Sequence, residues 1–215
     1  MVAKRRKVGN LLALAVLSTV VQRPMHPYEV MSLLRARGKE ADMEIKLGSL
    51  YTVMRNLAKH GFVEVVGTTR EGARPERTVY RITKAGQAEM VDWVRELVST
   101  PQPEPRRFTA GLSVLAALSP EEATALLRQR LALLERECAA RRESLTHDLQ
   151  TVPRLFLIED EYELATHEAE AAWVRSLLDD LSSGTFPGLA EWRRWKATGE
   201  MSPAMAELAE RGAEE

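Results

Sequence analysis

The segment Gly48–Gly61 carries side chains whose chemistry suits nucleic acid. If it forms a helix, the advance of about 100° per residue places four polar residues on one face: Thr52, Arg55, Asn56 and Lys59. Threonine and asparagine hydrogen-bond base edges, arginine forks onto guanine or phosphate, and lysine neutralises phosphate. The pattern predicts a recognition helix, although an ordinary surface helix has a similar mixed polar face.

The opposite face of this helix is apolar and would hold it against a core. Four residues form that stripe: Leu50, Val53, Met54 and Leu57. Tyr51 lies at the margin between the two faces, where its hydroxyl would touch a phosphate or its ring would pack.

Other elements must position this helix. Residues 8–22 and 25–38 predict two earlier helices, the first apolar nearly all round and therefore covered on several sides. Residues 62–67 and 78–83 are rich in β-branched side chains and predict an antiparallel hairpin. Three helices followed by a hairpin make a winged helix.

The tip of this hairpin is basic, with Arg70, Arg74 and Arg77. A solvated loop would carry such arginines too, but they follow a helix that is itself basic on its outer face, which favours nucleic-acid binding. The next helix, over 84–99, is capped by Thr83. Its apolar period predicts that Met90, Val94 and Leu97 point inward, with Trp93 beside them.

Charge divides the chain unevenly. Residues 1–100 hold 17 Lys and Arg against 10 Asp and Glu, whereas residues 101–215 hold 13 against 21. The split predicts that the N-terminal half meets a polyanion, the alternative being that the two halves attract one another. The cluster Lys4–Lys7 is expected to be a mobile basic arm that holds phosphates.

The cysteine content and the apolar segments predict a cytoplasmic protein without a membrane partner. Cys138 is the only cysteine, which excludes an intrachain disulfide and a thiolate metal cluster. The apolar run Leu11–Val21 after a basic cluster imitates a signal peptide, but it lacks a cleavage site and Pro24 ends it too early for a membrane span.

Five motifs in this order resemble the PadR-like family of bacterial transcriptional regulators: His26–Glu29, Gly48–Tyr51, Leu57–Glu64, Gly72–Thr83 and Ala85–Gly86. The resemblance covers about residues 10–98, and residues 106–182 look like the helical C-terminal domain of one subgroup. It implies a homodimeric repressor that binds a partly palindromic operator in double-stranded DNA and is released by a small-molecule effector. Pro27 and Thr52 depart from the commonest family pattern, which argues against transferring an operator sequence from other members.

The resulting set of predicted DNA-binding residues is Tyr28, Lys46, Ser49, Tyr51, Thr52, Arg55, Asn56, Lys59, Arg70, Arg74, Pro75 and Arg77. Two recognition helices would enter successive major grooves about 34–36 Å apart. The alternative is a protein-interaction module whose winged helix does not read DNA.

The second half begins after a proline-rich linker at 101–105. A helix over 120–150, capped by Ser119, carries a coiled-coil-like seam: Leu127, Leu131, Leu134, Cys138, Leu145 and Leu149. For a second helix over 154–181 the predicted inward stripe is Ile158, Tyr162, Ala165, Ala169, Ala172 and Ser176. Two long amphipathic helices cannot bury both faces by folding back once, which predicts a dimer; an antiparallel pair within a monomer is the alternative.

Small residues along the second long helix leave room for a ligand, and Tyr162 and Trp173 are the candidate effector-binding residues. Aromatic residues at helical spacing also form plain core. A last helix over 188–197 carries Trp192 and Trp195 and is expected to pack on the dimer.

Catalytic and metal chemistry find little support. His167 shares a helix face with Glu163 and Glu170, but metal sites usually draw ligands from more than one element. The sequence has no nucleotide-binding glycine fingerprint and no serine-nucleophile elbow, so we expect neither an enzyme nor a cofactor.

The predicted fold is mostly α with a small β-hairpin. It comprises a winged-helix DNA-binding domain over 1–100, the linker 101–105, an α-helical dimerisation and effector domain over 106–198, and a flexible tail over 199–215.

Overall fold

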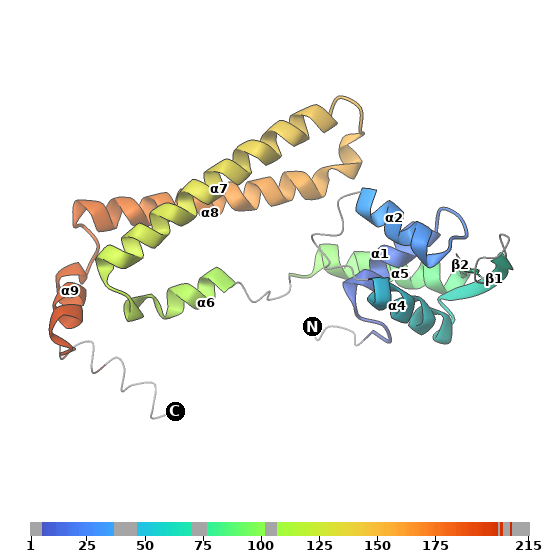
Figure 1. Ribbon diagram of the computed structural model, residues 1–215, viewed down its shortest axis with the longest axis horizontal. Coiled ribbons are helices and arrows are strands. Elements are labelled where there is room, and N and C mark those ends of the chain that lie inside the picture. The colour runs from blue at the N-terminus through green and yellow to red at the C-terminus, as the bar shows by residue number, and fades with distance from the viewer. Residues whose placement is uncertain are drawn as a thin grey trace. The chain divides into compact units, whose positions relative to one another are not determined.

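The computed structural model describes residues 6–36, 47–69, 77–101 and 107–201, with the single positions 203 and 207. The chain divides into two compact units, Met1–Glu104 and Pro105–Glu215. Each unit is described by itself, with elements labelled as in Figure 1.

The N-terminal unit is a winged helix, as the sequence predicts. Its elements are α1 (Leu11–Val20), α2 (Pro27–Ala36), α4 (Leu47–Lys59), β1 (Val63–Thr69), β2 (Arg77–Ile82) and α5 (Lys84–Ser99). Helix α1 packs against α2, α4 and α5 (Figure 1). It begins later than predicted because Asn10 caps it, the Asn10 side chain accepting a hydrogen bond from the Leu12 N–H at 2.8 Å.

The hairpin β1–β2 is antiparallel and pairs Val63 with Ile82, with a register shift between Val65 and Gly67. Met25, ahead of α2, adds a short bridge to it by exchanging two 2.9 Å backbone hydrogen bonds with Tyr80. This bridge ties the entry of α2 to the wing strand.

Two glycines are required by the local backbone, one at the end of α4 and one where α5 packs beside the hairpin. Gly61 ends α4 at φ 73°, a left-handed conformation that favours glycine. Gly86, in the first turn of α5, lies so close to the residue before β1 that a Cβ there would stand 2.0 Å from the Phe62 carbonyl oxygen. The Ala85–Gly86 motif therefore has a packing reason.

Helix α5 has the predicted bounds and the predicted cap, since the Thr83 hydroxyl accepts a hydrogen bond from the Gly86 N–H at 3.0 Å. Its predicted inner face is wrong in part. Trp93 is the buried residue, whereas Val94 and Leu97 are 46% and 40% exposed. The core of the unit contacts the side of the helix that carries Trp93 and the partly buried Met90.

The C-terminal unit is helical throughout its described part. It contains α6 (Arg107–Ser113), the 3₁₀ turn η1 (Leu115–Ala117), α7 (Pro120–Asp148), η2 (Arg154–Phe156), α8 (Ile158–Ser183) and α9 (Leu189–Thr198). Helices α7 and α8 lie side by side and run in opposite directions (Figure 1). The predicted Ser119 cap of α7 is present, accepting from the Glu122 N–H at 3.1 Å.

The seam between α7 and α8 uses only part of the predicted set. Leu127, Leu134 and Cys138 of α7 are buried, but Leu149 is 45% exposed. On α8 the predicted inward stripe is wrong for this chain, because the side chains against α7 are Leu164, Ala171, Val174, Leu178 and Leu181. The predicted stripe from Ile158 to Ser176 is exposed instead.

Helix α9 packs against other helices of its own unit. Trp192 is buried and donates its indole N–H to the Leu118 carbonyl at 3.0 Å. Leu189 and Trp192 join Ala123 and Val174 in one apolar cluster. The sequence predicts that this helix packs on the dimer, whereas the structure packs it on the core of its own unit.

Candidate nucleic-acid interface and effector cleft

Helix α4 has two sharply different faces. Its predicted inner residues are buried, with Leu50 and Met54 fully so and Val53 and Leu57 nearly so. This confirms the predicted apolar stripe and orients the opposite side of the helix outward.

The outer face of α4 is exposed and mostly unpartnered. Thr52, Arg55, Asn56 and Lys59 are all exposed. The Thr52 hydroxyl donates to the Gly48 carbonyl at 3.1 Å, which leaves its oxygen able to accept. Within the described part of the chain, Arg55, Asn56 and Lys59 form no side-chain hydrogen bond or ion pair, so all three are available to a ligand.

A groove of about 600 Å³ runs along this face. Residues 7–10, which precede α1, form one wall, and Ser49, Thr52, Asn56 and Lys59 of α4 line the other together with neighbouring residues. This wall could not be predicted, because nothing in the local sequence shows that residues 7–10 lie beside a helix some 40 positions later.

Tyr51 and Tyr28 flank the entry of α2. The Tyr51 ring meets the His26 ring edge-on, with centroids 6.1 Å apart, and remains 39% exposed. Tyr28 is 63% exposed. Both hydroxyl-bearing rings are accessible to solvent, although Tyr51 also packs.

The N-terminus of α2 is held by a reciprocal pair of hydrogen bonds. The His26 ring Nδ1 accepts from the Tyr28 N–H at 3.1 Å, and the His26 N–H donates to Glu29 Oε2 at 2.8 Å. That backbone hydrogen bond, helped by Arg23 at 3.0 Å, lowers the pKa of Glu29 despite partial burial. The device is a capping box with histidine at the cap.

Part of the predicted DNA-binding set cannot be placed. Lys46, Arg70, Arg74 and Pro75 lie outside the described residues, and for Arg77 only the backbone is described, in β2 opposite Thr69. The predicted tip of the wing is therefore not placed in space.

The expectation of a wholly mobile basic arm at Lys4–Lys7 is wrong for Arg6. Its side chain is only 4% exposed and pairs with Glu89 of α5 at 2.7 Å, with Glu96, and with Asp92 at 3.5 Å. Burial opposes the guanidinium charge, but the hydrogen bonds to Glu89 and Glu96 outweigh it and raise the pKa of Arg6. Lys7 is exposed.

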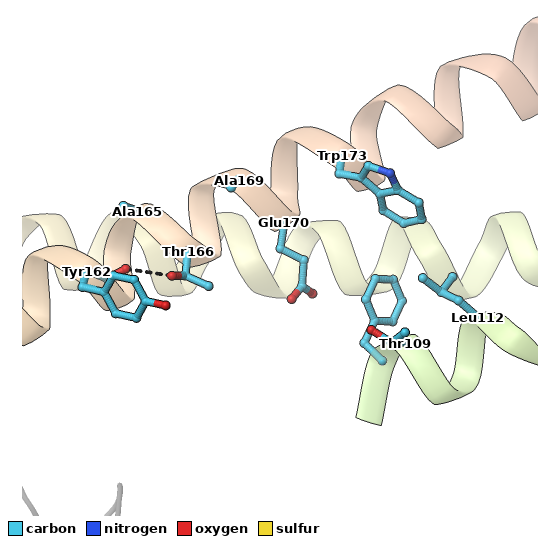
Figure 2. A pocket seen from close by; sticks show the side chains of 9 residues that line it. Thr109, Leu112, Tyr162, Ala165, Thr166, Ala169, Glu170 and Trp173 are labelled. Atoms are coloured by element: carbon cyan, nitrogen blue, oxygen red, sulfur yellow. Dashed lines mark hydrogen bonds between the residues drawn. The ribbon is translucent and has the colours of Figure 1, made fainter. Parts of the chain in front are cut away.

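The C-terminal unit contains a cleft of about 570 Å³ between α6 and α8. Tyr162 and Trp173, the two predicted effector residues, both line it, with Tyr162 toward one end and Trp173 toward the other (Figure 2). Leu112 approaches the Trp173 end from α6, and Ala165 and Ala169 line the wall between.

An arginine and an aromatic ring support one wall of this cleft. The Arg130 guanidinium of α7 stacks on the Phe108 ring at 3.8 Å and donates from Nε to Glu170 Oε1 at 2.7 Å. The Phe108 ring in turn meets Trp173 edge-on at 6.0 Å. Phe108, Arg130 and Glu170 were not singled out as effector residues because they come from three different helices.

His167 lies between two carboxylates in the structure. Its ring nitrogens are 3.9 Å from carboxylate oxygens of both Glu137 and Glu163. Glu170 is engaged by Arg130 instead. In the described residues no group of three or more His, Cys, Asp or Glu side chains is arranged to hold a metal ion.

The three-helix core, the hairpin and the exposed cationic face of α4 define a winged-helix protein of the DNA-binding type. The model of the transcriptional regulator PadR-like family matches residues 16–92. The matched residues all lie in the N-terminal unit, which therefore carries the sequence features of this family of transcriptional regulators.

Solved structures share the fold over most of the chain. A Bacillus subtilis PadR crystallised with operator DNA is 20% identical with a TM-score of 0.64, and the alignment covers 80% of this chain and 99% of that one. A B. subtilis PadR crystallised with p-coumaric acid is 18% identical with a TM-score of 0.62 and the same coverages. The Vibrio cholerae virulence activator AphA is 18% identical with a TM-score of 0.57, covering 80% and 98%.

A sequence search of curated proteins finds no match. Among the helices that the structure describes, none combines the length and the apolar character that a membrane crossing requires.

Proposed function

We propose that this chain is a homodimeric, DNA-binding transcriptional repressor that is released from its operator by a small molecule. The observation that carries the proposal is the outer face of α4. Arg55, Asn56 and Lys59 are exposed there, without partners among the residues that the structure describes, and the opposite side of the helix is a buried apolar stripe. A B. subtilis PadR of the same fold was crystallised with operator DNA, which supports the assignment of this face to DNA.

Arg55 and Asn56 are proposed to contact base edges in the major groove. The Thr52 hydroxyl is proposed to accept or donate a hydrogen bond in the same DNA groove. Lys59, Ser49 and the wing arginines are proposed to contact phosphates, which position the protein without reading sequence. Tyr28 and Tyr51 are accessible at the edge of this surface and would add phosphate contacts through their hydroxyls.

The dimer is proposed to form through α8. This helix has apolar residues on two opposite sides, because successive side chains advance by about 100°. Val174, Leu178 and their neighbours cover one side against α7, whereas Ile158, Tyr162 and Trp173 on the other side are 52%, 67% and 49% exposed. Ala165, Ala169 and Ala172 lie between them and permit a close approach of a second helix.

A second copy of the chain is the proposed occupant of that exposed side. A twofold dimer buries the same patch on both subunits, and it gives two recognition helices for two half-sites of a partly palindromic operator. The alternating steps of three and four from Ile158 to Ser176 match a helix–helix seam.

The effector is proposed to bind in the cleft that Tyr162 and Trp173 line. The cleft shares the proposed dimerisation face of α8, so a ligand there would act on the arrangement of the two subunits. It would release DNA only if it favours the arrangement that does not bind the operator. A B. subtilis PadR crystallised with p-coumaric acid makes that compound a suitable first probe.

The test of DNA reading compares two exposed arginines in the N-terminal unit. Arg55→Ala should weaken discrimination for a duplex selected by the wild-type protein by ~1–3 kcal/mol if Arg55 reads a base. Arg95→Ala on α5 removes the same charge outside the α4 face and should have a small effect. Binding is measured by fluorescence anisotropy at fixed salt. Equal binding by both variants and the wild type would show that Arg55 does not read the duplex, and a wild type that selects no duplex would favour the interaction-module alternative.

The test of the dimer introduces one charge on each of two helices. Ala169→Glu places a carboxylate in the proposed interface and should shift the protein toward monomer in sedimentation, while circular dichroism stays unchanged. Ala140→Glu, at an exposed position of α7, is the control and should leave the oligomeric state as it is. A monomeric wild type would establish the intrachain alternative.

The test of the effector cleft follows release of the selected duplex on addition of p-coumaric acid and related aromatic acids. Trp173→Ala should raise the concentration needed for release, whereas Trp195→Ala on α9 should not. The effector assignment fails if the wild type is not released by any of these acids, or if both variants respond as the wild type does.

A further inference from the structure

The Arg6 side chain is buried against α5, although it belongs to the basic segment Lys4–Lys7. Its guanidinium lies 5.2 Å from the centre of the Trp93 ring and contacts three carboxylates of α5, those of Glu89, Asp92 and Glu96. Its Nε is buried without a hydrogen-bond partner among the described residues. The side chain is therefore fixed from several directions at once.

Such a contact is poorly explained by stability alone. Removing a guanidinium from water costs several kcal/mol, and a buried ion pair often does no better than an apolar replacement. An unpartnered buried N–H adds to that cost. What a multiply paired arginine does supply is a defined geometry, because its planar fork fits carboxylates in few orientations.

The geometry that Arg6 fixes is that of the next four residues. Lys7 is exposed, Val8 packs against the core, and Asn10 caps α1. These residues form the wall of the groove that faces Thr52, Asn56 and Lys59 of α4. The segment is thus held at both ends, by Arg6 on α5 and by Asn10 on α1.

We propose that Arg6 is a positioning residue for DNA binding, which clamps the segment to α5 so that Lys7 contacts a phosphate beside the recognition helix. The inference rests on the proposed function and adds to it a buried residue that fixes the place of one phosphate contact outside the helix and the wing. A preformed cation loses less conformational freedom on binding than a mobile one, since ordering a long side chain and its backbone is costly.

The clamp also neutralises part of the acidic charge of α5. Three carboxylates of α5 surround Arg6, and without the guanidinium they would repel the phosphates of an approaching duplex. Loss of Arg6 should therefore weaken binding through the freed segment and through the uncovered acids.

The experiment is a double-mutant cycle on the full-length chain, with the slope of log affinity against log salt as the readout. The probes are a duplex that the wild type selects from random-sequence DNA and a scrambled duplex of equal length. Lys7→Gln should lower the slope by about 0.9, the value for one lost phosphate contact, on both probes. Arg6→Met, which keeps the side-chain volume, should lower it at least as much.

Coupling between the two residues distinguishes positioning from a purely structural role. If Arg6 acts through Lys7, adding Lys7→Gln to Arg6→Met should produce little further change. An unchanged slope in Arg6→Met, even with a lower melting temperature, would overturn the proposal, as would fully additive effects. Arg6→Lys keeps the charge but not the fork and should recover only part of the slope.

A second variant tests the clamp if Arg6→Met does not fold. The double substitution Glu89→Gln with Glu96→Gln weakens the same clamp from α5 and should lower the salt slope as Arg6→Met would. A wild-type slope in that double variant overturns the proposal. Wild-type protein that selects no duplex contradicts the proposed function itself. Wild-type selection with an unaltered slope in Lys7→Gln contradicts only the role of the clamp.

Discussion

The two units differ in what they leave exposed. In the N-terminal unit, α4 buries its apolar stripe completely and presents polar and cationic side chains outward. In the C-terminal unit, α8 buries one apolar side against α7 and leaves a second apolar side open. The first surface suits a polyanion and the second suits another apolar surface, so one chain carries two kinds of binding face on helices of separate units.

The difference also concerns how each core is closed. Helices, the hairpin and Met25 surround the core of the N-terminal unit from several sides. The C-terminal unit has a long seam between two helices, extended at one end by α9. We therefore expect the stability of the N-terminal unit to be independent of protein concentration, and that of the C-terminal unit to rise with it if the dimer forms.

The largest effect should come from truncation at the closed core. Met54→Ala removes a side chain that is 0% exposed and should destabilise the N-terminal unit by about 2–5 kcal/mol. Hydrogen exchange read by mass spectrometry should show the loss in α1, α2 and α4 and little change in α7 and α8. Equal loss in both units would show that they unfold as one and would break the comparison.

Two neighbouring leucines of α7 test the seam between α7 and α8. Leu134 is 6% exposed and Leu133 is 46% exposed. Leu134→Ala should cost about 2–3 kcal/mol through lost burial and a cavity, and Leu133→Ala should cost well under about 1 kcal/mol by the area that it covers. Denaturant unfolding of both variants measures the pair. A large loss at Leu133 would mean that α7 too has a covered outer face.

Much of the N-terminal unit could be predicted because its signals are local. Leu50, Val53, Met54 and Leu57 recur with the helical period, and Thr83 is a typical N-cap residue directly before a predicted helix. Contacts between distant segments left no such trace. Arg6 reaches α5 more than 80 residues later, and its basic neighbours made it look like part of a mobile arm.

The C-terminal unit shows why a periodic pattern is ambiguous. Both sides of α8 carry apolar residues, and the stripe from Ile158 to Ser176 has the more regular spacing. The chain nevertheless packs Leu164, Val174 and Leu178 against α7, since larger side chains bury more area. Periodicity identifies an apolar face, but it does not say which partner covers it.

A smaller effect is expected at the junction of α5 and the wing. Gly86→Ala should destabilise the N-terminal unit by about 1–3 kcal/mol, because its Cβ would meet the Phe62 carbonyl oxygen at 2.0 Å and that backbone has little room to move. Gly48→Ala is the matched control, since nothing lies within 4 Å of its Cβ position. It should be neutral or stabilising by about 0.5–1 kcal/mol, as for glycine in a helix. Thermal melts that rank the two variants in the opposite order would contradict this packing.

The smallest expected effect is the dependence of stability on pH through Glu29. The His26 N–H and Arg23 lower the folded-state pKa of Glu29, so its carboxylate stabilises the fold above its ordinary pKa, and that contribution is lost as pH falls through the lower folded value. Glu29 is partly exposed, and solvent screening keeps the effect to a few tenths of a kcal/mol. Glu29→Gln should be slightly less stable than the wild type at neutral pH, and the gap should close in acid. Parallel stability curves down to the lowest pH would show that the carboxylate charge adds nothing, and that the cap of α2 depends on its neutral hydrogen bond alone.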